Sequence, residues 1–218
     1  MESENRNLLI EGAKTFGIHL DGKAIESFEL YLKEILKWNQ KINLTAIRTE
    51  KGIVLKHFLD SLSVCPHLPG ISSLLDIGSG AGFPGIPLRI VQPSLKITLI
   101  DSVRKKVDFQ RHVIRVLGLK GMEAIHGRVQ DKEILRSMSG RFDLVISRAF
   151  TDLRNLLILS FPFVKKGGSV LAMKGELDNK ENPLSSGIEK TQYRLQKTIP
   201  LTLPFSDFKR TILQFEKQ

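Results

Sequence analysis

Residues 74–88 read LLDIGSGAGFPGIPL, and the interpretation of the whole chain begins with this stretch. The apolar run that ends at Asp76 predicts a short buried strand. Gly78, Gly80 and Gly82 follow at every second position, where a sharp turn from a strand into a helix needs residues without a Cβ atom. Such a turn presents main-chain N–H groups at a helix N-terminus, so a dinucleotide or an adenosyl group can lie directly against the backbone.

The spacing of the glycines separates these two ligands. A dinucleotide fingerprint has the form G-x-G-x-x-G, but counting from Gly78 and Gly80 places Phe83 where the third glycine belongs. An acid two residues before the first glycine, as at Asp76, resembles motif I of methyltransferases that use S-adenosylmethionine (SAM), where it can reach the cationic end of the methionine. The alternative is a glycine-rich turn that binds no ligand.

A second acidic residue favours the SAM interpretation. Residues 96–100 predict the next strand, which ends in Asp101, at the place where nucleotide-binding α/β proteins hold a ribose diol with a carboxylate. Asp101 can also cap the helix predicted from Arg104, and that role is compatible with ribose binding.

The composition narrows the classes of partner. The chain has 218 residues, a formal net charge of +10 and a pI near 9.8, which favours a polyanionic partner, nucleic acid first. The simpler explanation is a solubilising surface, because the basic residues are scattered among 23 acidic ones. Cys65 is the only cysteine, which excludes an internal disulfide and a cysteine-based zinc site.

We expect a soluble, cytoplasmic monomer that binds no metal and no membrane. The first residues are acidic, and no apolar stretch approaches the roughly 20 residues that span a bilayer. The lone cysteine fits a reducing compartment. No excess apolar stripe predicts a subunit interface.

The first part of the chain predicts a helical lobe over residues 1–70, packed on a methyltransferase domain over residues 71–218. Phe28, Leu32 and Ile35 lie on one helix face, and no Pro/Ser-rich linker precedes residue 74. Residues 38–45, WNQKINLT, combine side-chain amides with the only tryptophan, which suits recognition of base edges. Taken alone, this segment favours a structural role, with Trp38 in the core and a cap at Asn43 or Thr45.

A helix predicted over residues 49–64 carries three polar side chains on one face. His57, Asp60 and Ser61 are spaced at i, i+3 and i+4. One helix cannot hold them in the relay geometry of a catalytic triad, so a hydrolase is excluded.

The remaining chain alternates strands and helices, which predicts an α/β, Rossmann-like fold with a mostly parallel central sheet. We expect strands at 122–126, 142–146 and 169–173, helices at 104–117 and 153–164, and a polar loop or broken helix at 176–187. Runs 193–203 and 210–215 are expected to pair antiparallel at the sheet edge. The strand ends should supply one site, formed by Gly78, Asp101, Val129, Arg148 and Lys174.

Two of these strand ends suggest particular contacts. In the loop 127–131, Val129 can pack on an adenine ring and Gln130 can hydrogen-bond its edge. Arg148, in the segment Ser147–Phe150, can clamp a phosphate or the methionine carboxylate; a surface ion pair is the alternative.

Several segments together resemble the small-subunit (16S) ribosomal RNA guanine-N7 methyltransferase family RsmG, also called GidB, over nearly the whole chain. They are WNQKINLTA from Trp38, HFLDSL from His57, LLDIGSGAGFPGIPL from Leu74, LIDSVRKKVDF from Leu99, residues 128–130, ISRAF from Ile146 and MKG from Met173. The continuation FPGIP is far more specific than a generic methyltransferase turn.

The resemblance implies the following roles. SAM would be the cofactor, and the partner would be small-subunit ribosomal RNA or the 30S subunit. Cofactor contacts are implied for Asp76, Gly78, Gly80, Phe83, Asp101, Val129, Gln130 and Arg148. Substrate-side or site-supporting roles are implied for Arg128, Lys174, Asn39, His57, Asp60 and Arg148. Family members often carry Glu at the position of Gln130, where an amide can still accept one hydrogen bond.

The implied chemistry agrees with what the sequence lacks. Guanine N7 already has an in-plane lone pair, so methyl transfer needs alignment and desolvation rather than a base or a covalent cysteine. Residues 147–150 replace the Asn/Asp-Pro-Pro-aromatic motif of amino-group methyltransferases, and Cys65 lies in the helical lobe. Two alternatives stay open at this point: an NAD-dependent oxidoreductase, and a non-catalytic RNA-binding or assembly factor with a vestigial SAM pocket.

Overall fold

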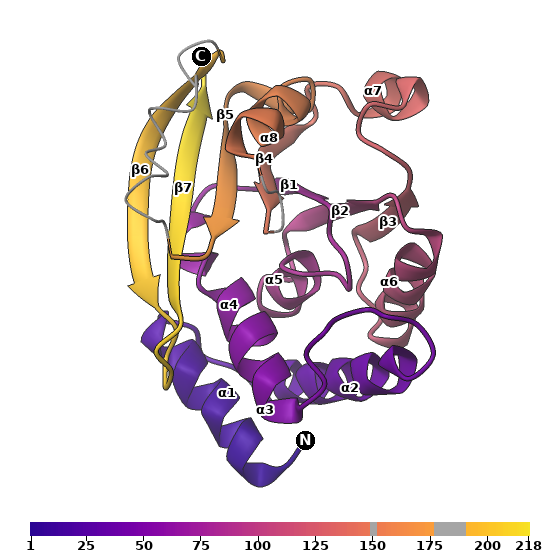
Figure 1. Ribbon diagram of the computed structural model, residues 1–218, viewed down its shortest axis with the longest axis vertical. Helices are drawn as coiled ribbons and strands as arrows, with labels where there is room; N and C mark the ends of the chain where they lie inside the picture. The colour runs from indigo at the N-terminus through magenta and orange to yellow at the C-terminus, as the bar shows by residue number, and fades with distance from the viewer. Residues whose placement is uncertain (149–151, 177–190) are drawn as a thin grey trace.

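The computed structural model describes residues 1–148, 152–176 and 191–218. These residues form a seven-stranded sheet in the order β3-β2-β1-β4-β5-β7-β6 (Figure 1). The strands are β1 Ser73–Ile77, β2 Lys96–Asp101, β3 Met122–His126, β4 Phe142–Ser147, β5 Val164–Lys174, β6 Tyr193–Thr202 and β7 Lys209–Lys217. Strands β1 to β5 pair in parallel, and β7 pairs antiparallel with both β5 and β6. The expected fold class is confirmed, including the antiparallel C-terminal edge.

Helices cover both faces of this sheet (Figure 1). They are α1 Ser3–Thr15, α2 Gly22–Asn39, α3 Glu50–Ile53, a π-helix Val54–Leu59, α4 Asp60–Leu62, a 3-10 turn Cys65–His67, α5 Gly85–Val91, α6 Arg104–Val116, α7 Lys132–Met138 and α8 Leu153–Ser160. Because side chains alternate along a strand, neighbouring residues enter different cores. Leu74 of β1 belongs to the core shared with α1, α2, α5 and α6, whereas Leu75 belongs to the core shared with α7 and α8.

The N-terminal helices form because their apolar stripes meet the sheet. Asp21 caps the N-terminus of helix α2, and its carboxylate accepts a hydrogen bond from the Ala24 N–H at 2.7 Å. Phe28, Leu32 and Ile35 are at most 1% exposed, so the predicted stripe is confirmed. The core of α1 and α2 continues without interruption into β5 and β7. The boundary at residue 70 stays a prediction.

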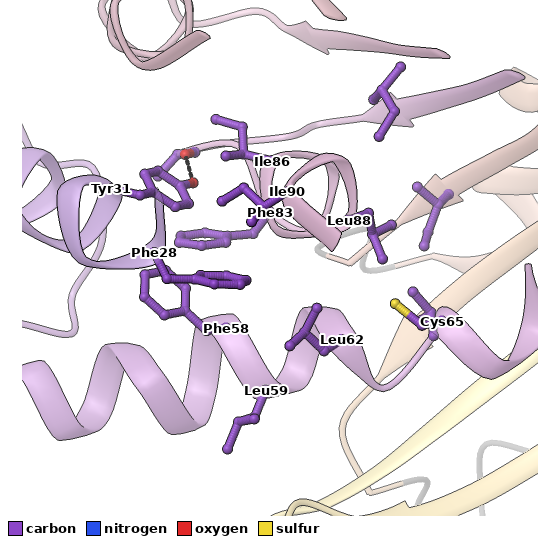
Figure 2. Close-up of a cluster of buried hydrophobic side chains, with 14 of the residues drawn as sticks. Phe28, Tyr31, Phe58, Leu59, Leu62, Cys65, Phe83, Ile86, Leu88 and Ile90 are labelled. Carbon is purple, nitrogen blue, oxygen red and sulfur yellow. Dashed lines mark hydrogen bonds between the residues drawn. The ribbon is translucent and has the colours of Figure 1, made fainter. Parts of the chain in front are cut away.

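Aromatic rings form the centre of this core (Figure 2). The rings of Phe28 and Tyr31, from α2, lie 5.0 Å and 5.5 Å from the ring of Phe58, measured between centroids. The ring of Phe83, from the turn before α5, lies 5.5 Å from Tyr31. The helical segments therefore pack directly against the turn that the glycines form.

Two expected element boundaries were wrong. The helix expected over 153–164 ends at Ser160, because Pro162 follows and cannot continue a helix. The strand expected over 169–173 begins earlier, at Val164, since Phe142 of β4 already pairs with this residue. The helix expected over 49–64 is divided by the π-helix, which widens the turn around His57.

In the described part of the chain, no helix is both long enough and apolar enough to cross a bilayer. Nor do the described residues contain a group of three or more His, Cys, Asp or Glu side chains arranged to hold a metal ion.

Candidate functional site

Three glycines with positive φ shape the turn between β1 and α5. The φ angles of Gly78, Gly80 and Gly82 are 70°, 60° and 96°, in the left-handed region that favours glycine. A Cβ atom on Gly82 would collide with the side chain of Ile86. A Cβ atom on Gly78 would meet nothing within 4 Å, and Gly78 is exposed. The turn is therefore closed toward the core and open on the side where a ligand can approach.

Asp101, at the end of β2, fixes the open side of this turn. Its Oδ2 accepts a hydrogen bond from the Gly80 N–H at 2.8 Å, and its Oδ1 accepts one from the Val103 N–H at 2.8 Å. Each carboxylate oxygen has a second lone pair. Asp101 can therefore hold the turn and still accept hydrogen bonds from a ribose diol.

Asp76 lies beneath the turn and is fully buried. Its Oδ2 accepts a hydrogen bond from the Gly85 N–H at 3.0 Å, while its Oδ1 has no partner among the described residues. Burial raises the pKa of Asp76 well above its usual range, and the Gly85 N–H opposes that rise. The unpartnered oxygen is left for a donor that the described protein atoms do not supply.

Two side chains from helices donate to the carbonyl groups of the turn. The Tyr31 hydroxyl of α2 donates to the Ala81 carbonyl at 2.6 Å, drawn as the dashed line in Figure 2. The Gln110 amide of α6 donates to the Gly80 carbonyl at 2.7 Å and to the Ser79 hydroxyl at 2.8 Å. Tyr31 and Gln110 are both fully buried. The turn is thus held from the N-terminal helices as well as from the sheet.

A cavity of about 300 Å³ opens beside this turn at the carboxyl ends of β1, β2 and β3. It is lined by Ile77, Gly78, Ile100, Asp101, Ser102, Gly127, Arg128, Val129, Gln130 and Leu159. The structure therefore brings together the predicted residues of the first three strand ends. Apolar side chains beside a carboxylate and an exposed glycine backbone fit an adenosyl group, so the cavity can hold SAM.

A second cluster lies where β4 ends. The Arg148 Nη1 donates to the Lys56 carbonyl at 3.2 Å and to the Nδ1 of His57 at 3.0 Å. The guanidinium lies 4.9 Å from the centroid of the Phe83 ring. Phe83 is only 3% exposed, and its ring stacks on His57 with centroids 4.5 Å apart. Direct contact between Phe83 and the cofactor stays a prediction.

Asp60 joins Arg148 to a second arginine. Its Oδ2 lies 3.6 Å from the Arg148 Nη1, and its Oδ1 accepts from the Arg210 Nε at 3.0 Å. Burial raises the pKa of Asp60, and both guanidinium groups oppose that rise. Burial also lowers the pKa of Arg148. We call His57, Asp60, Phe83, Arg148 and Arg210 the arginine cluster.

His57 is held as a neutral ring in this cluster. Its pKa is lowered to about 3, first by burial and then by the charge of Arg148. Since Nδ1 accepts from Arg148, the proton of the neutral ring lies on Nε2, which is 2.7 Å from the Thr45 hydroxyl. The hydroxyl of Ser61, which was expected on the same face, donates a hydrogen bond to the main-chain carbonyl of His57 at 2.6 Å and not to its ring.

Among the described residues, Asn39 is connected to the arginine cluster through Thr45. Its Oδ1 accepts from the Leu44 and Thr45 N–H groups at 2.9 Å and 3.2 Å, and its Nδ2 donates to the Thr45 carbonyl at 2.9 Å. Asn39 therefore shapes the segment after α2, which agrees with the structural role that this segment favoured when taken alone.

Lys174 and Arg128 lie apart from each other. Lys174 is half-buried at the end of β5. Arg128 is exposed beside the cavity, and its main-chain N–H donates to the Asp131 carboxylate at 2.7 Å. Residues 149 and 150 of the predicted segment after β4, and nearly all of the loop expected over 176–187, lie outside the described residues.

Tyr31, Thr45, Gln110 and Arg210 were missed as site residues by sequence reasoning. Tyr31 is part of the apolar stripe of α2, so the sequence indicated only a core position for it. Arg210 lies in a strand that carries no recognisable motif. Gln110 gave the one available signal, since an amide stands there between the buried Val107 and Val113 on the apolar face of α6.

The strand order and the glycine turn define the chain as an α/β protein with the fold of SAM-dependent methyltransferases. It is similar to a solved SAM-dependent methyltransferase from Aquifex aeolicus, with a TM-score of 0.56, 15% identity and coverage of 84% of this chain and 97% of that one. It is also similar to M. jannaschii TYW2 in complex with AdoMet, with a TM-score of 0.53, 19% identity and coverage of 67% and 69%.

The family follows from closer relatives. The family model described as GidB, rRNA small subunit methyltransferase G, matches residues 24–212. A ribosomal RNA small subunit methyltransferase G from Acetivibrio thermocellus is 41% identical over 99% of this chain and 90% of its own length. One from Geotalea uraniireducens is 40% identical over 100% and 99%. The chain belongs to the GidB family of rRNA small subunit methyltransferases, which argues against the NAD-dependent oxidoreductase.

Proposed function

We propose that this protein is a SAM-dependent methyltransferase that acts on small-subunit ribosomal RNA and methylates N7 of one guanine. The observation that carries the proposal is the open glycine turn, held by Asp101 beside a cavity that Val129 and Gln130 line. Membership of the GidB family supports the substrate class.

We propose a role in cofactor binding for each residue of the cavity. The backbone at Gly78 would lie against the ligand, and Asp101 would accept from the ribose. Val129 would pack on the adenine, and Gln130 would hydrogen-bond its edge. SAM would supply a methyl group activated by its sulfonium. Asp76 is fully buried and does not line the cavity, so we propose that it supports the cofactor site from beneath, by accepting from the Gly85 N–H.

The residues of the arginine cluster support transfer to a nitrogen that needs no deprotonation. With its pKa lowered to about 3, His57 stays uncharged at neutral pH and has both ring nitrogens engaged. The reaction moves positive charge onto the base, so a guanidinium nearby cannot stabilise that charge. We infer that Arg148 binds and orients, with His57 and Asp60 as positioning residues.

The remaining predicted site residues take supporting roles in this proposal. Asn39 fixes the main chain at Thr45, whose hydroxyl meets His57. Arg128, which follows β3, and Lys174, which ends β5, would both meet the RNA at the carboxyl edge of the sheet. Arg128 is an exposed cation and Lys174 a half-buried one, and both are suited to phosphate. We further propose that the protein works as a monomer in the cytoplasm, with the helical lobe 1–70 and the domain 71–218 acting as one body.

The direct test is methyl transfer from labelled SAM to three substrates in parallel: free small-subunit RNA, intact small subunits and large subunits. Cleavage of the product at N7-methylguanine then locates the label. Label at one guanine of the small-subunit RNA is the expected result. SAM binding without label in any substrate would instead favour the non-catalytic RNA-binding factor.

A pair of glycine variants tests the cofactor site independently of RNA. Gly78 and Gly17 have φ angles of 70° and 73°, and a Cβ atom at either position meets nothing within 4 Å. Changing either to Ala should therefore destabilise the fold by a similar amount, about 1 kcal/mol. Only Gly78→Ala should weaken SAM binding, measured by calorimetry. Equal SAM affinity in the two variants would remove Gly78 from the cofactor site.

A further inference from the structure

The turn that joins β6 to β7, residues 203–208, presents an aromatic side chain to solvent. Phe205 is 62% exposed and has a φ of 57°, a conformation that a bulky L-residue rarely adopts. Gly or Asn would adopt it with less strain. Because the ring is not buried, packing does not offset this strain. Strained residues that persist without a packing reason are candidates for function.

Hydrogen bonds within the turn hold Phe205 in this position. The Leu203 N–H donates to the Phe208 carbonyl at 2.9 Å. The Ser206 hydroxyl donates to the Leu203 carbonyl at 2.9 Å and accepts from the Phe208 N–H at 3.3 Å. Leu203 is 1% exposed and anchors the turn to the core. The exposed ring is therefore carried on a closed turn.

The turn lies beside the arginine cluster. The Lys56 Nζ lies 4.1 Å from the centroid of the Phe208 ring, and the Lys56 carbonyl accepts from Arg148. Pairing of β5 with β7 stops at Lys174, while β6 and β7 continue to pair up to Lys209. The hairpin consequently extends beyond the carboxyl end of β5, the edge at which the proposed site lies (Figure 1).

Three cations lie on or next to the turn that carries the ring, two of them in ion pairs: Lys209 with Glu176 at 2.7 Å and Arg210 with the buried Asp60 at 3.0 Å. Lys209 and Arg210 follow the turn directly, and Lys56 packs against it from the π-helix. An exposed aromatic ring among cations is the arrangement with which proteins bind single-stranded RNA, since the ring stacks on a base and the cations meet the backbone.

We propose that Phe205 stacks on an unpaired base of the RNA substrate close to the guanine that is methylated. The inference rests on the proposed function, because it takes ribosomal RNA as the substrate. It assigns the hairpin turn 203–208 to substrate binding, whereas the cavity at β1 to β3 is assigned to the cofactor.

The test compares three variants in binding to protein-free small-subunit RNA, with a titration of salt. Phe205→Asn removes the ring and suits the backbone angle, so the fold should be at least as stable as that of the wild type. Its affinity for RNA should fall about five- to tenfold, as expected for one lost stack. Phe205→Tyr keeps a ring and should bind nearly as the wild type does. Ile158→Ala removes an exposed apolar side chain of α8, 49% exposed, and should change nothing.

Two further measurements identify the kind of contact. The salt dependence of Phe205→Asn should match that of the wild type, because no phosphate contact is lost, whereas Lys209→Ala should reduce the slope. SAM affinity should be the same in all variants. Unchanged RNA affinity in Phe205→Asn would overturn the proposal. A loss seen with intact subunits but not with free RNA would also overturn it and indicate a ribosomal protein as the partner.

Failure of this inference can be told apart from failure of the proposed function. If the wild type methylates RNA and Phe205→Asn keeps the same KM for RNA, only the stacking contact is wrong. If the wild type binds RNA without methylating it, the enzyme assignment is wrong, and the binding comparison still decides the role of Phe205.

Discussion

At the scale of single residues, the hydroxyl group of Tyr31 connects the N-terminal helices to the glycine turn between β1 and α5. Burial raises the pKa of Tyr31 well above its usual range, so the hydroxyl stays protonated and donates to Ala81. Changing Tyr31 to Phe keeps the ring packing and leaves the buried carbonyl unpaired. We expect SAM affinity to fall about five- to tenfold, in line with about 1 kcal/mol for a hydrogen bond. Titration calorimetry measures this directly.

The chain contains its own control for this change. Tyr193, the second of two tyrosines, is also buried, and its hydroxyl pairs with the Ser160 hydroxyl at 3.1 Å, away from the turn. Tyr193→Phe should lower the melting temperature about as much as Tyr31→Phe, yet leave SAM affinity unchanged. If Tyr31→Phe raised kcat or left the KM for SAM at the wild-type value, Tyr31 would be a core residue with no positioning role.

At the scale of elements, the π-helix Val54–Leu59 brings His57 under Phe83 and Arg148. The pKa of His57 is about 3 in the folded protein, against 6.5 ordinarily. Between these values the unfolded chain binds the proton more readily than the folded one. The stability that depends on neutral His57 is therefore complete above pH 6.5 and falls as the pH drops toward 3.

Urea unfolding at two pH values tests this consequence. At pH 5 the wild type should have lost about 2 kcal/mol through His57, relative to pH 7. His57→Gln should lose less over the same interval, although burial also lowers the pKa of His67 and adds to the slope in both proteins. A His57→Gln slope equal to that of the wild type would contradict neutral burial of the ring.

Helices and strands were easier to predict from the sequence than the contacts that form the site. Apolar runs such as residues 142–146 indicate strands, and the end of each strand can be located from the residues around it. Contacts between distant segments leave no local pattern. Arg210 and Asp60 pair across 150 residues. The Tyr31 hydroxyl donates to a main-chain carbonyl, a group that every residue has and that no sequence pattern marks. The positions of Asp101 and Gln130 were accordingly predictable, whereas those of Tyr31 and Arg210 were not.

At the scale of the whole molecule, the helical segments and the sheet share one core. This core contains Leu9 of α1 and Phe28 of α2 together with Met173 of β5 and Ile212 of β7, all at most 4% exposed. Polar contacts join the same two parts of the molecule. The Tyr31 hydroxyl of α2 donates to the turn before α5, while Asp60 of α4 and Lys56 of the π-helix contact Arg210 and Phe208 of the C-terminal hairpin. The proposed lobe 1–70 therefore has little basis for folding separately from residues 71–218.

This shared core predicts a single cooperative unfolding transition. Trp38, the only tryptophan, packs on Phe109 and His112 of α6 with ring centroids 5.5 Å and 5.2 Å away, so its fluorescence reports the contact between the helical lobe and the domain. Far-UV circular dichroism reports the whole fold. The two thermal transitions should coincide. SAM at about 100 times its Kd should raise the free energy of unfolding by about 2.7 kcal/mol, so both midpoints should rise by the same number of degrees. Phe28→Ala, a change in the lobe, should lower both midpoints together. A fluorescence transition that came first would show that the lobe unfolds by itself, and that the boundary at residue 70 separates two stable units.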